Sequence, residues 1–316
     1  MSERRRRCGA QVLREPPLTV RRRVARAAGR TWARLHYAQH VEPHLLSISR
    51  LRLPIRNLPS SFDGLRIVHL SDWHLHDDES IHRVQESIEL ANALEPDLVA
   101  ITGDFIHDGH SKIETAGRLA AHIRASYGVV AVFGNHDWAV RSYWLRRYHA
   151  SQPRRRRLRQ SLRSALESYG VRVLQNEHFL LDRSRDVVAV VGLEDLWSHR
   201  CDVEAALKNL PPEIPRIILA HNPMTIEKLK SYRCDLLLAG HTHGGQIKLL
   251  QNRLLAFGRA VRHYRAGLYR ANEGWLYVTT GVGCGSFRMR YGVPPEIAVI
   301  TVYPGDPDRD PYVIHR

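Results

Sequence analysis

Short apolar runs that end in Asp, Asn or His recur along the chain. Five of them read LRIVHLSDWH (65–74), DLVAITGD (97–104), GVVAVFGNHD (128–137), RIILAHNP (216–223) and CDLLLAGHTH (234–243). Each run is too short for a typical helix, and most have Gly or Pro beside the polar residues, which is typical of a buried strand that ends in a loop. The pattern therefore predicts five strands with polar side chains at their carboxyl ends.

The segments between these strands have helical length and spacing. Residues 81–94 and 113–125 are the clearest examples. Strands that alternate with helices indicate repeated βα units. We therefore expect an α/β fold in which the polar loops collect on one rim, where open α/β sheets place their ligands.

The first 44 residues have a different pattern. Residues 18–40 read as a basic helix, with Val, Ala, Trp, Leu and Tyr loosely gathered and Arg on the remaining positions. Prolines bracket this segment, so we expect a basic N-terminal extension over 1–44, with an amphipathic helix as one interpretation of it, and the folded body over 45–316. The extension could lie on anionic lipid, remain a solvated tail, or contact nucleic acid.

Composition and charge narrow the class of protein. The chain has 316 residues, 43% hydrophobic content and a net charge of +15. No stretch approaches the roughly 20 apolar residues of a membrane span and no secretory signal is readable, so we expect a cytoplasmic protein. Four cysteines stand far apart and are interpreted as free thiols, which argues against a disulfide framework or a thiolate zinc site. They are Cys8, Cys201, Cys234 and Cys284.

A second arginine-rich block occupies residues 141–163 and contains no acidic residue. Arg presents a planar fork that suits phosphate, so the block could bind a diphosphate, a nucleotide or an anionic lipid head group. Aromatic residues between the arginines would permit base stacking or insertion at a lipid interface. The alternative is a solvated helix surface, and the sequence does not choose between them.

The polar residues at the strand ends form a set of metal ligands. Seven of them offer oxygen or imidazole nitrogen and none offers sulfur, which suits Mn, Fe, Zn or another first-row ion better than a calcium site. Seven are too many for one tetrahedral ion, whereas two divalent ions that share a bridging carboxylate would use them all. The seven are Asp72, His74, Asp104, Asn135, His221, His241 and His243.

The order and spacing of these motifs resemble the calcineurin-like metallophosphoesterases. The string DxH, GD, GNHD, AHNP and GHTHGGQ carries the resemblance, which extends over residues 41–303 and within the family is similar to the YkuE/YaeI-type branch. The resemblance implies a four-layer αββα sandwich of two mixed sheets flanked by helices. It also implies that Asp72, His74 and His243 hold one ion. Asn135, His221 and His241 would hold the other, and Asp104 would bridge.

The same resemblance implies roles for the residues after Asn135. His136 would stabilise the transition state or act as an acid toward the leaving oxygen, and Asp137 would orient its ring. The family's GDxxD pattern is broken here, because His107 or the displaced Asp108 stands where the second Asp is expected. The remaining histidines lack ligand-type spacing and are interpreted as ordinary residues. They include His69, His76, His82, His107, His110, His122, His149 and His178.

Together the motifs predict a dinuclear metal-dependent phosphohydrolase, acting as a phosphodiesterase or pyrophosphatase. The branch resemblance suggests UDP-2,3-diacylglucosamine or another lipid-linked phosphoester as substrate, at the inner face of the cell membrane. A metal-dependent nuclease is an alternative that the basic charge favours and the absence of a nucleic-acid module disfavours. A non-catalytic protein that binds membrane or nucleic acid is a third alternative.

Overall fold

The computed structural model describes residues 20–140, 151–249, 253–254, 259–285, 288–310 and 312–315. The first part of the second arginine block, residues 141–150, lies outside these ranges, as does Cys8. None of the helices in the described part of the chain combines the length and apolar character that spanning a bilayer requires.

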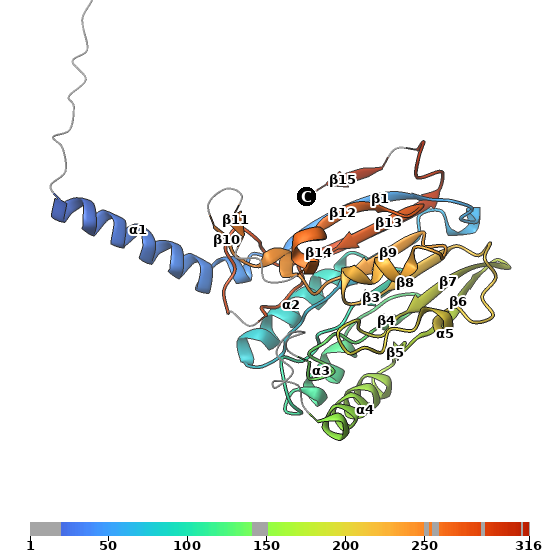
Figure 1. Ribbon diagram of the computed structural model, residues 1–316, viewed down its shortest axis with the longest axis horizontal. Helices are drawn as coiled ribbons and strands as arrows, with labels where there is room; N and C mark the ends of the chain where they lie inside the picture. Colours follow the sequence, from blue (N-terminus) through green and yellow to red (C-terminus); the bar gives the residue numbers. More distant parts are fainter. Residues whose placement is uncertain are drawn as a thin grey trace, which may run out of the picture.

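Two mixed sheets form the centre of the body (Figure 1). The larger sheet has seven strands, and its central strands β2 to β5 run parallel. In spatial order these strands are β15 (Val313–His315), β1 (Ser47–Ile55), β14 (Glu296–Pro304), β2 (Arg66–Leu70), β3 (Leu98–Ile101), β4 (Val129–Ala131) and β5 (Val171–Val173). Because β14 runs antiparallel to β2 and parallel to β1, the sheet is mixed.

The smaller sheet has six strands, of which β13, β9, β8 and β7 run parallel. In spatial order they are β12 (Gly267–Ala271), β13 (Gly274–Val278), β9 (Leu236–Ala239), β8 (Arg216–Leu219), β7 (Asp186–Gly192) and β6 (Glu177–Arg183). Every residue of β8 and β9 is buried. This explains their unbroken apolar sequences, because a strand covered on both faces has no solvent-facing positions.

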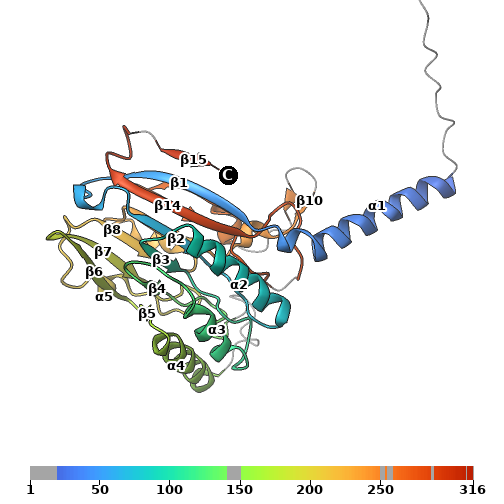
Figure 2. The same cartoon turned by 180° about the vertical axis from the view of Figure 1, so that it is seen from behind.

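Helices cover the outer faces, which confirms the expected four-layer sandwich (Figures 1 and 2). The larger sheet carries α2 (Asp78–Ala93), α3 (Ile113–Ala120) and α4 (Gln152–Ser168). The smaller sheet carries only short segments, α5 (Val203–Ala206), the 3-10 helix η4 (Pro223–Leu229) and α6 (Arg259–His263). A continuous apolar cluster fills the space between the sheets. The predicted helix over 113–125 is shorter than expected, because 3-10-type turns replace it after Ala120.

The N-terminal helix α1 (Val20–His40) projects away from the body, as both ribbon views show. Within the segment 18–40, where a basic helix is expected, the described residues from Val20 to His40 form this helix. At its end, the Ala38 carbonyl accepts a hydrogen bond from the Arg290 backbone N–H, at 2.8 Å. The 3-10 helix η1 (Glu42–His44) then leads into β1, and the Glu42 carboxylate accepts hydrogen bonds from the backbone of Gly292 and Val293.

Candidate metal centre

The five motif loops meet at one place between the two sheets. Three follow the carboxyl ends of β2, β3 and β4 in the larger sheet, and two follow β8 and β9 in the smaller one. Backbone hydrogen bonds tie the first two loops together, since the Asp72 N–H donates to the Gly103 carbonyl and the His74 N–H to the Asp104 carbonyl, each at 2.9 Å. The expected gathering of polar loops on one rim is thus what the structure shows.

One group of side chains surrounds the Asp72 carboxylate. His74 Nε2 lies 3.0 Å from His243 Nε2 and 3.8 Å from Asp72 Oδ1, and His243 Nε2 lies 3.3 Å from Asp72 Oδ1. All three side chains are buried. Asp104 Oδ2 adds a fourth donor, 3.4 Å from His74 Nε2. This set, Asp72, His74 and His243 with Asp104, is called the first donor group.

A second donor group lies on the other side of Asp104. His221 Nε2 is 3.2 Å from the same Asp104 Oδ2 and 3.2 Å from His241 Nδ1. Asn135 Oδ1 is 2.9 Å from His241 Nδ1. The second donor group is therefore Asn135, His221 and His241 with Asp104. A single carboxylate oxygen belongs to both groups, as a bridging ligand would.

The donor atoms fit divalent cations. Two imidazole nitrogens 3.0 Å apart can share only one proton, whereas both can direct a lone pair at a cation between them. Burial lowers the pKa of His74 and His243 well below the ordinary value, so both rings are neutral and able to act as ligands. Burial also lowers the pKa of His221, but nearby carboxylates, Asp104 foremost, raise it to about 10, which shows how strongly this position attracts positive charge.

The backbone of these loops is bent into an unusual conformation. Five of the seven donors have a positive φ although they are not glycine, a conformation that costs of order 1–3 kcal/mol each. They are Asp72, His74, Asp104, His241 and His243, with φ between 48° and 70°. Two glycines make room for the carboxylates, because a Cβ on Gly134 would lie 2.1 Å from Asp104 Oδ1, and one on Gly240 would lie 2.3 Å from Asp72 Oδ2.

Backbone carbonyls orient the donors of the second group. His221 Nδ1 lies 2.6 Å from the Thr102 carbonyl oxygen, to which it donates, so that Nε2 is the nitrogen that faces Asp104 and would bind an ion. The Asn135 side-chain amide donates to the Val140 carbonyl at 2.6 Å, which directs Oδ1 toward His241. Such partners fix both the tautomer and the direction of a ligand.

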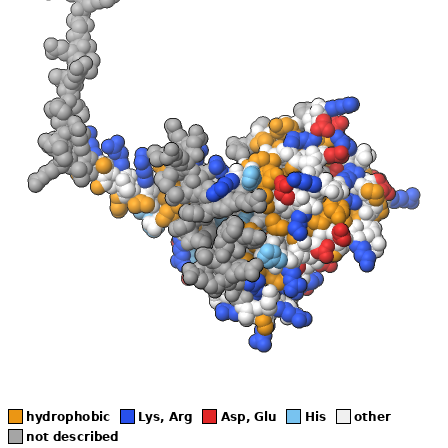
Figure 3. All heavy atoms as spheres, viewed as in Figure 1, with side chains coloured by type: hydrophobic (Ala, Val, Ile, Leu, Met, Phe, Trp, Pro, Cys, Tyr) orange, Lys and Arg blue, Asp and Glu red, His pale blue; other side chains and the backbone are white. Residues whose placement is uncertain are grey.

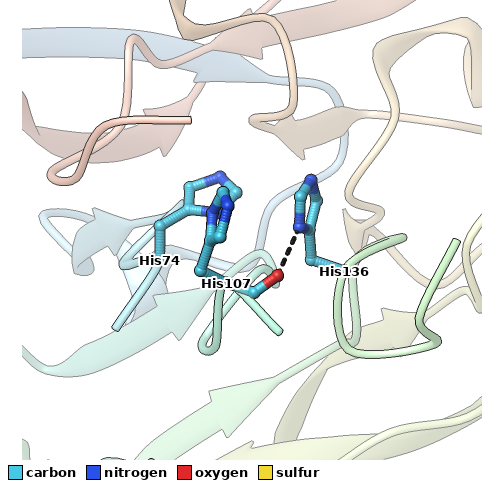
Figure 4. A group of neighbouring side chains, drawn as sticks. All are labelled: His74, His107 and His136. Carbon is cyan, nitrogen blue, oxygen red and sulfur yellow. Dashed lines mark hydrogen bonds between the residues drawn. The ribbon is translucent and has the colours of Figure 1, made fainter. Parts of the chain in front are cut away.

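The expected role of Asp137 in orienting His136 is wrong. His136 Nδ1 instead lies 2.7 Å from the His107 carbonyl oxygen, the bond drawn as a dashed line in Figure 4. The Asp137 carboxylate points elsewhere, because its Oδ2 accepts hydrogen bonds from the backbone N–H groups of Asp104 at 2.8 Å and Gly134 at 2.9 Å. Asp137 thus ties the β3 and β4 loops together.

His107, interpreted as an ordinary residue, lies within the site. Its ring stands beside those of His74 and His136, with centroid distances of 5.4 Å and 5.1 Å, and the three form a cluster (Figure 4). Its Nδ1 is 3.4 Å from His74 Nδ1. The signal in the sequence was the position itself, three residues after Asp104, where the family pattern has a second Asp.

Trp197 is a second residue that the ligand pattern did not reveal. Its ring packs edge-to-face against His241, with centroids 4.4 Å apart. The adjacent Asp195 is buried, and burial raises the pKa of its carboxyl to about 7. Both lie in the VGLEDLW string after β7, which carries no metal-ligand spacing and could be found only by its similarity to related chains.

Comparison with known proteins agrees with this geometry. The sequence model of the calcineurin-like phosphoesterases matches residues 65–245, more than half of the chain. The chain belongs to the calcineurin-like phosphoesterase family. The match begins one residue before β2 and ends after the two histidines that follow β9, so it includes all five motif loops of this phosphoesterase.

Relatives of this calcineurin-like phosphoesterase cover nearly all of its length. UDP-2,3-diacylglucosamine pyrophosphatase LpxG of Chlamydia muridarum is 31% identical, with 85% of this chain and 92% of that protein covered. Metallophosphoesterase YkuE of Bacillus subtilis is 29% identical, covering 84% and 88%. Phosphodiesterase YaeI of Escherichia coli is 28% identical, covering 89% and 98%. The chain is therefore a phosphoester hydrolase of this family, which decides against a non-catalytic binding protein.

Proposed function

We propose that the chain hydrolyses a phosphodiester or pyrophosphate with two divalent metal ions held between the sheets. The observation that carries this proposal is the position of Asp104 Oδ2, which lies 3.4 Å from His74 Nε2 and 3.2 Å from His221 Nε2. One carboxylate oxygen shared by two groups of nitrogen and oxygen donors is the arrangement that a dinuclear hydrolase needs.

Each donor group would hold one ion. Asp72, His74 and His243 would bind the first and Asn135, His221 and His241 the second, with Asp104 as the bridge. The mixture of carboxylate, amide and imidazole ligands suits Mn, Fe or Zn. When bound, such ions polarise a phosphoryl oxygen and lower the pKa of water, which supplies a nucleophile at neutral pH.

His136 is the residue that we propose for the leaving-group side of the reaction. Because its Nδ1–H donates to the His107 carbonyl, Nε2 is the nitrogen available to a substrate. The ring lies 4.7 Å from that of His74, centroid to centroid, and so borders the first donor group. From there Nε2 could hydrogen-bond a phosphoryl oxygen or give a proton to the leaving oxygen. Asp137 would act indirectly, by holding the backbone of Asp104.

The substrate class that we propose is a lipid-linked phosphoester or pyrophosphate, such as UDP-2,3-diacylglucosamine. The similarity to the LpxG pyrophosphatase supports a pyrophosphate bond in the substrate. The N-terminal helix supports a substrate that is linked to a lipid. On α1, Arg26, Arg30 and Arg34 recur every four residues along one face, while Trp32 and Leu35 lie on the opposite face and are 68% and 50% exposed. Figure 3 shows basic and hydrophobic side chains on the projecting helix.

We therefore propose that residues 1–44 place the catalytic domain, residues 45–316, on an anionic membrane at its inner face. A helix with opposed basic and apolar faces lies in the plane of the interface. Replacing Trp32 and Leu35 by Ser should reduce binding to phosphatidylglycerol vesicles at low salt, and deleting residues 1–40 should abolish it, with turnover unchanged. Leu90→Ser with Leu180→Ser is the matched control, because both leucines are exposed on the body. Undiminished vesicle binding by the Trp32/Leu35 variant would contradict the proposal.

Asp104→Asn tests the catalytic proposal. Removing the shared carboxylate should lower hydrolysis of bis-p-nitrophenyl phosphate by about 10³-fold or more and reduce the metal content below two ions per chain. Asp108→Asn is the control, since Asp108 is exposed and belongs to neither donor group. Full activity of Asp104→Asn would refute the site. Metal-dependent cleavage of plain DNA or RNA at a rate exceeding that on UDP-2,3-diacylglucosamine would favour the nuclease instead.

A further inference from the structure

A cavity, called the second cavity to distinguish it from the metal centre, lies beside that centre, where β1 and β14 begin. Its volume is about 320 Å³. It opens between the first residues of β1 and β14, the loop after His243 and the turn before β12, and residues 292–294 form one wall. Neither donor group lines it, so this space is distinct from the proposed metal sites.

Two cations stand at this cavity without a carboxylate partner. Lys248 and Arg265 are exposed, and among the described residues no carboxylate pairs with the Lys248 ammonium or the Arg265 guanidinium. Other cations of the chain do have carboxylate partners, for example Arg56 with Asp306 at 2.9 Å. Two unpaired cations at one opening create a local positive potential that attracts anions.

The carboxylate inside the cavity already has hydrogen-bond donors from the protein. Glu296 is 7% exposed, and its carboxylate accepts bonds from Ser49 Oγ, Tyr277 OH at 2.8 Å, Thr279 Oγ1 at 3.0 Å and the Thr280 N–H at 3.1 Å. Behind the wall, the fully buried Arg290 guanidinium donates to backbone carbonyls that include those of Gly281 and Val293. Glu42 is also buried and accepts hydrogen bonds from the N–H groups of Gly292 and Val293 in the wall, so the charges around the cavity are three positive and two negative.

The hydroxyls of the cavity are arranged to accept further hydrogen bonds. Ser47 Oγ donates to the Pro295 carbonyl and Thr280 Oγ1 to the Pro294 carbonyl, each at 2.8 Å. Since each hydroxyl has one hydrogen and that hydrogen is used, the oxygen lone pairs remain for a donor on a ligand. Ala266 and Val293 supply apolar walls. A ligand that carries both an anionic group and hydroxyls matches this lining.

The cavity also shares its walls with the metal centre. Gly244, which lines the cavity, directly follows His243 of the first donor group. Thr280 lines the cavity, and the next residue, Gly281, packs so closely on Asp72 that a Cβ there would lie 2.7 Å from the Asp72 Cβ. A molecule in the cavity would therefore contact residues directly beside His243 and beside the glycine that packs on Asp72.

We propose that this cavity binds the phosphate and hydroxyls of a sugar phosphate, with Lys248 and Arg265 on the phosphate. The group could belong to a distal part of the substrate or to a separate effector, and the chemistry of recognition is the same. Only the link to turnover rests on the proposed hydrolase function. Binding itself does not.

Calorimetric titration of the full chain with glucose 6-phosphate tests the binding site. Titrations use the Asp104→Asn background, which prevents turnover. Lys248→Ala with Arg265→Ala should weaken binding by about tenfold or more, because two charge-assisted contacts are lost. Lys208→Ala with Arg183→Ala removes the same charge from exposed positions elsewhere and should change affinity by less than about twofold. No binding by the parent, or equal binding by the Lys248/Arg265 variant, would overturn the proposal.

Kinetics then distinguish the two sources of the ligand. If the sugar phosphate is part of the substrate, the Lys248/Arg265 variant should raise KM for UDP-2,3-diacylglucosamine about tenfold, and the Lys208/Arg183 control variant should not. If it is an effector, glucose 6-phosphate should alter bis-p-nitrophenyl phosphate hydrolysis by the native chain and not by the variant. If the Lys248/Arg265 variant resembles the native chain in KM, in its response to glucose 6-phosphate and in binding, the site is refuted. Intact binding in a chain with no hydrolase activity would refute only the catalytic proposal.

Discussion

The two donor groups share Asp104 but differ in how their remaining ligands are oriented. In the second group, the Thr102 carbonyl fixes the His221 ring and the Val140 carbonyl fixes the Asn135 amide, both at 2.6 Å. In the first group, His74 Nδ1 meets only another imidazole, that of His107, at 3.4 Å, and His243 Nδ1 has no hydrogen-bond partner within the described ranges. The second group is therefore the better ordered before any ion binds.

Because of this difference, we expect the two donor groups to bind their ions with different affinities. Partners that orient a metal ligand typically contribute 10–100-fold to metal affinity. We expect the ion of the second group to be bound tightly, and the ion of the first group to exchange more readily. The first group also borders His136 and the shared wall of the second cavity, so the more exchangeable ion lies where the substrate would arrive.

Removing one imidazole from each group should have the largest effect. His221→Ala and His243→Ala should each lower bis-p-nitrophenyl phosphate hydrolysis by about 10²–10³-fold, because both ions are needed. The metal content should differ, however. His243→Ala should retain close to one ion per chain after dialysis and His221→Ala less, as measured by mass spectrometry of the metals. Equal retention by the two variants would remove the distinction between the groups.

Metal removal from the native chain provides the next largest effect. Titration with a chelator should release the two ions in two steps separated by about 10–100-fold in chelator concentration. Activity should disappear with the first step, and adding metal back at that stage should restore it. A single step that releases both ions together would show that the groups bind with the same affinity.

His107→Asp should sharpen the comparison by giving His74 Nδ1 a carboxylate partner. A carboxylate beside His74 Nδ1 accepts its N–H and makes the ring a better ligand, so affinity for the weaker ion should rise by about tenfold. The His107 carbonyl that orients His136 is part of the backbone and is kept. Metal affinity can be measured by competition with a chelating dye. His110→Asp, an exposed neighbour, is the control and should have no effect.

Trp197→Ala should have the smallest effect and should act on the second group. Loss of the edge-to-face contact with His241 removes about 1 kcal/mol of packing, so the affinity of the tighter ion should fall by roughly fivefold. Trp32→Ala, on α1, is the matched control for metal affinity. A larger decrease for the weaker ion than for the tighter one would mean that Trp197 supports a different part of the site.

The sequence predicted the seven donors because each follows a short buried strand and changes the local pattern from apolar to polar. It could not predict what orients them. The acceptors for His221 and His136 are the backbone carbonyls of Thr102 and His107, and a carbonyl oxygen is common to all residues and leaves no trace in composition. The role expected for Asp137 came from the family resemblance, whereas the acceptor that the structure shows for His136 is a backbone carbonyl.

In the fold, too, some elements could be predicted from the sequence and others could not. The parallel strands and the helix α2 follow from periodicity, and the observed Asp78–Ala93 closely matches the predicted 81–94. The two-sheet arrangement came only from the family resemblance, because strand pairing depends on contacts far apart in sequence. The second arginine block also could not be interpreted locally. Within its described part, Arg159 pairs with Glu194 at 2.9 Å, and Leu158 and Leu162 are buried.

The left-handed backbone at five of the proposed ligands links metal binding to heat resistance. Without ions, these residues hold a conformation that their side chains oppose, and closely spaced carboxylates repel one another with no cation between them. Bound ions offset both costs and, by mass action, favour the folded chain. The metal-free protein should therefore melt at a lower temperature than the loaded one, with the loops after β2, β3 and β9 as the first parts to open.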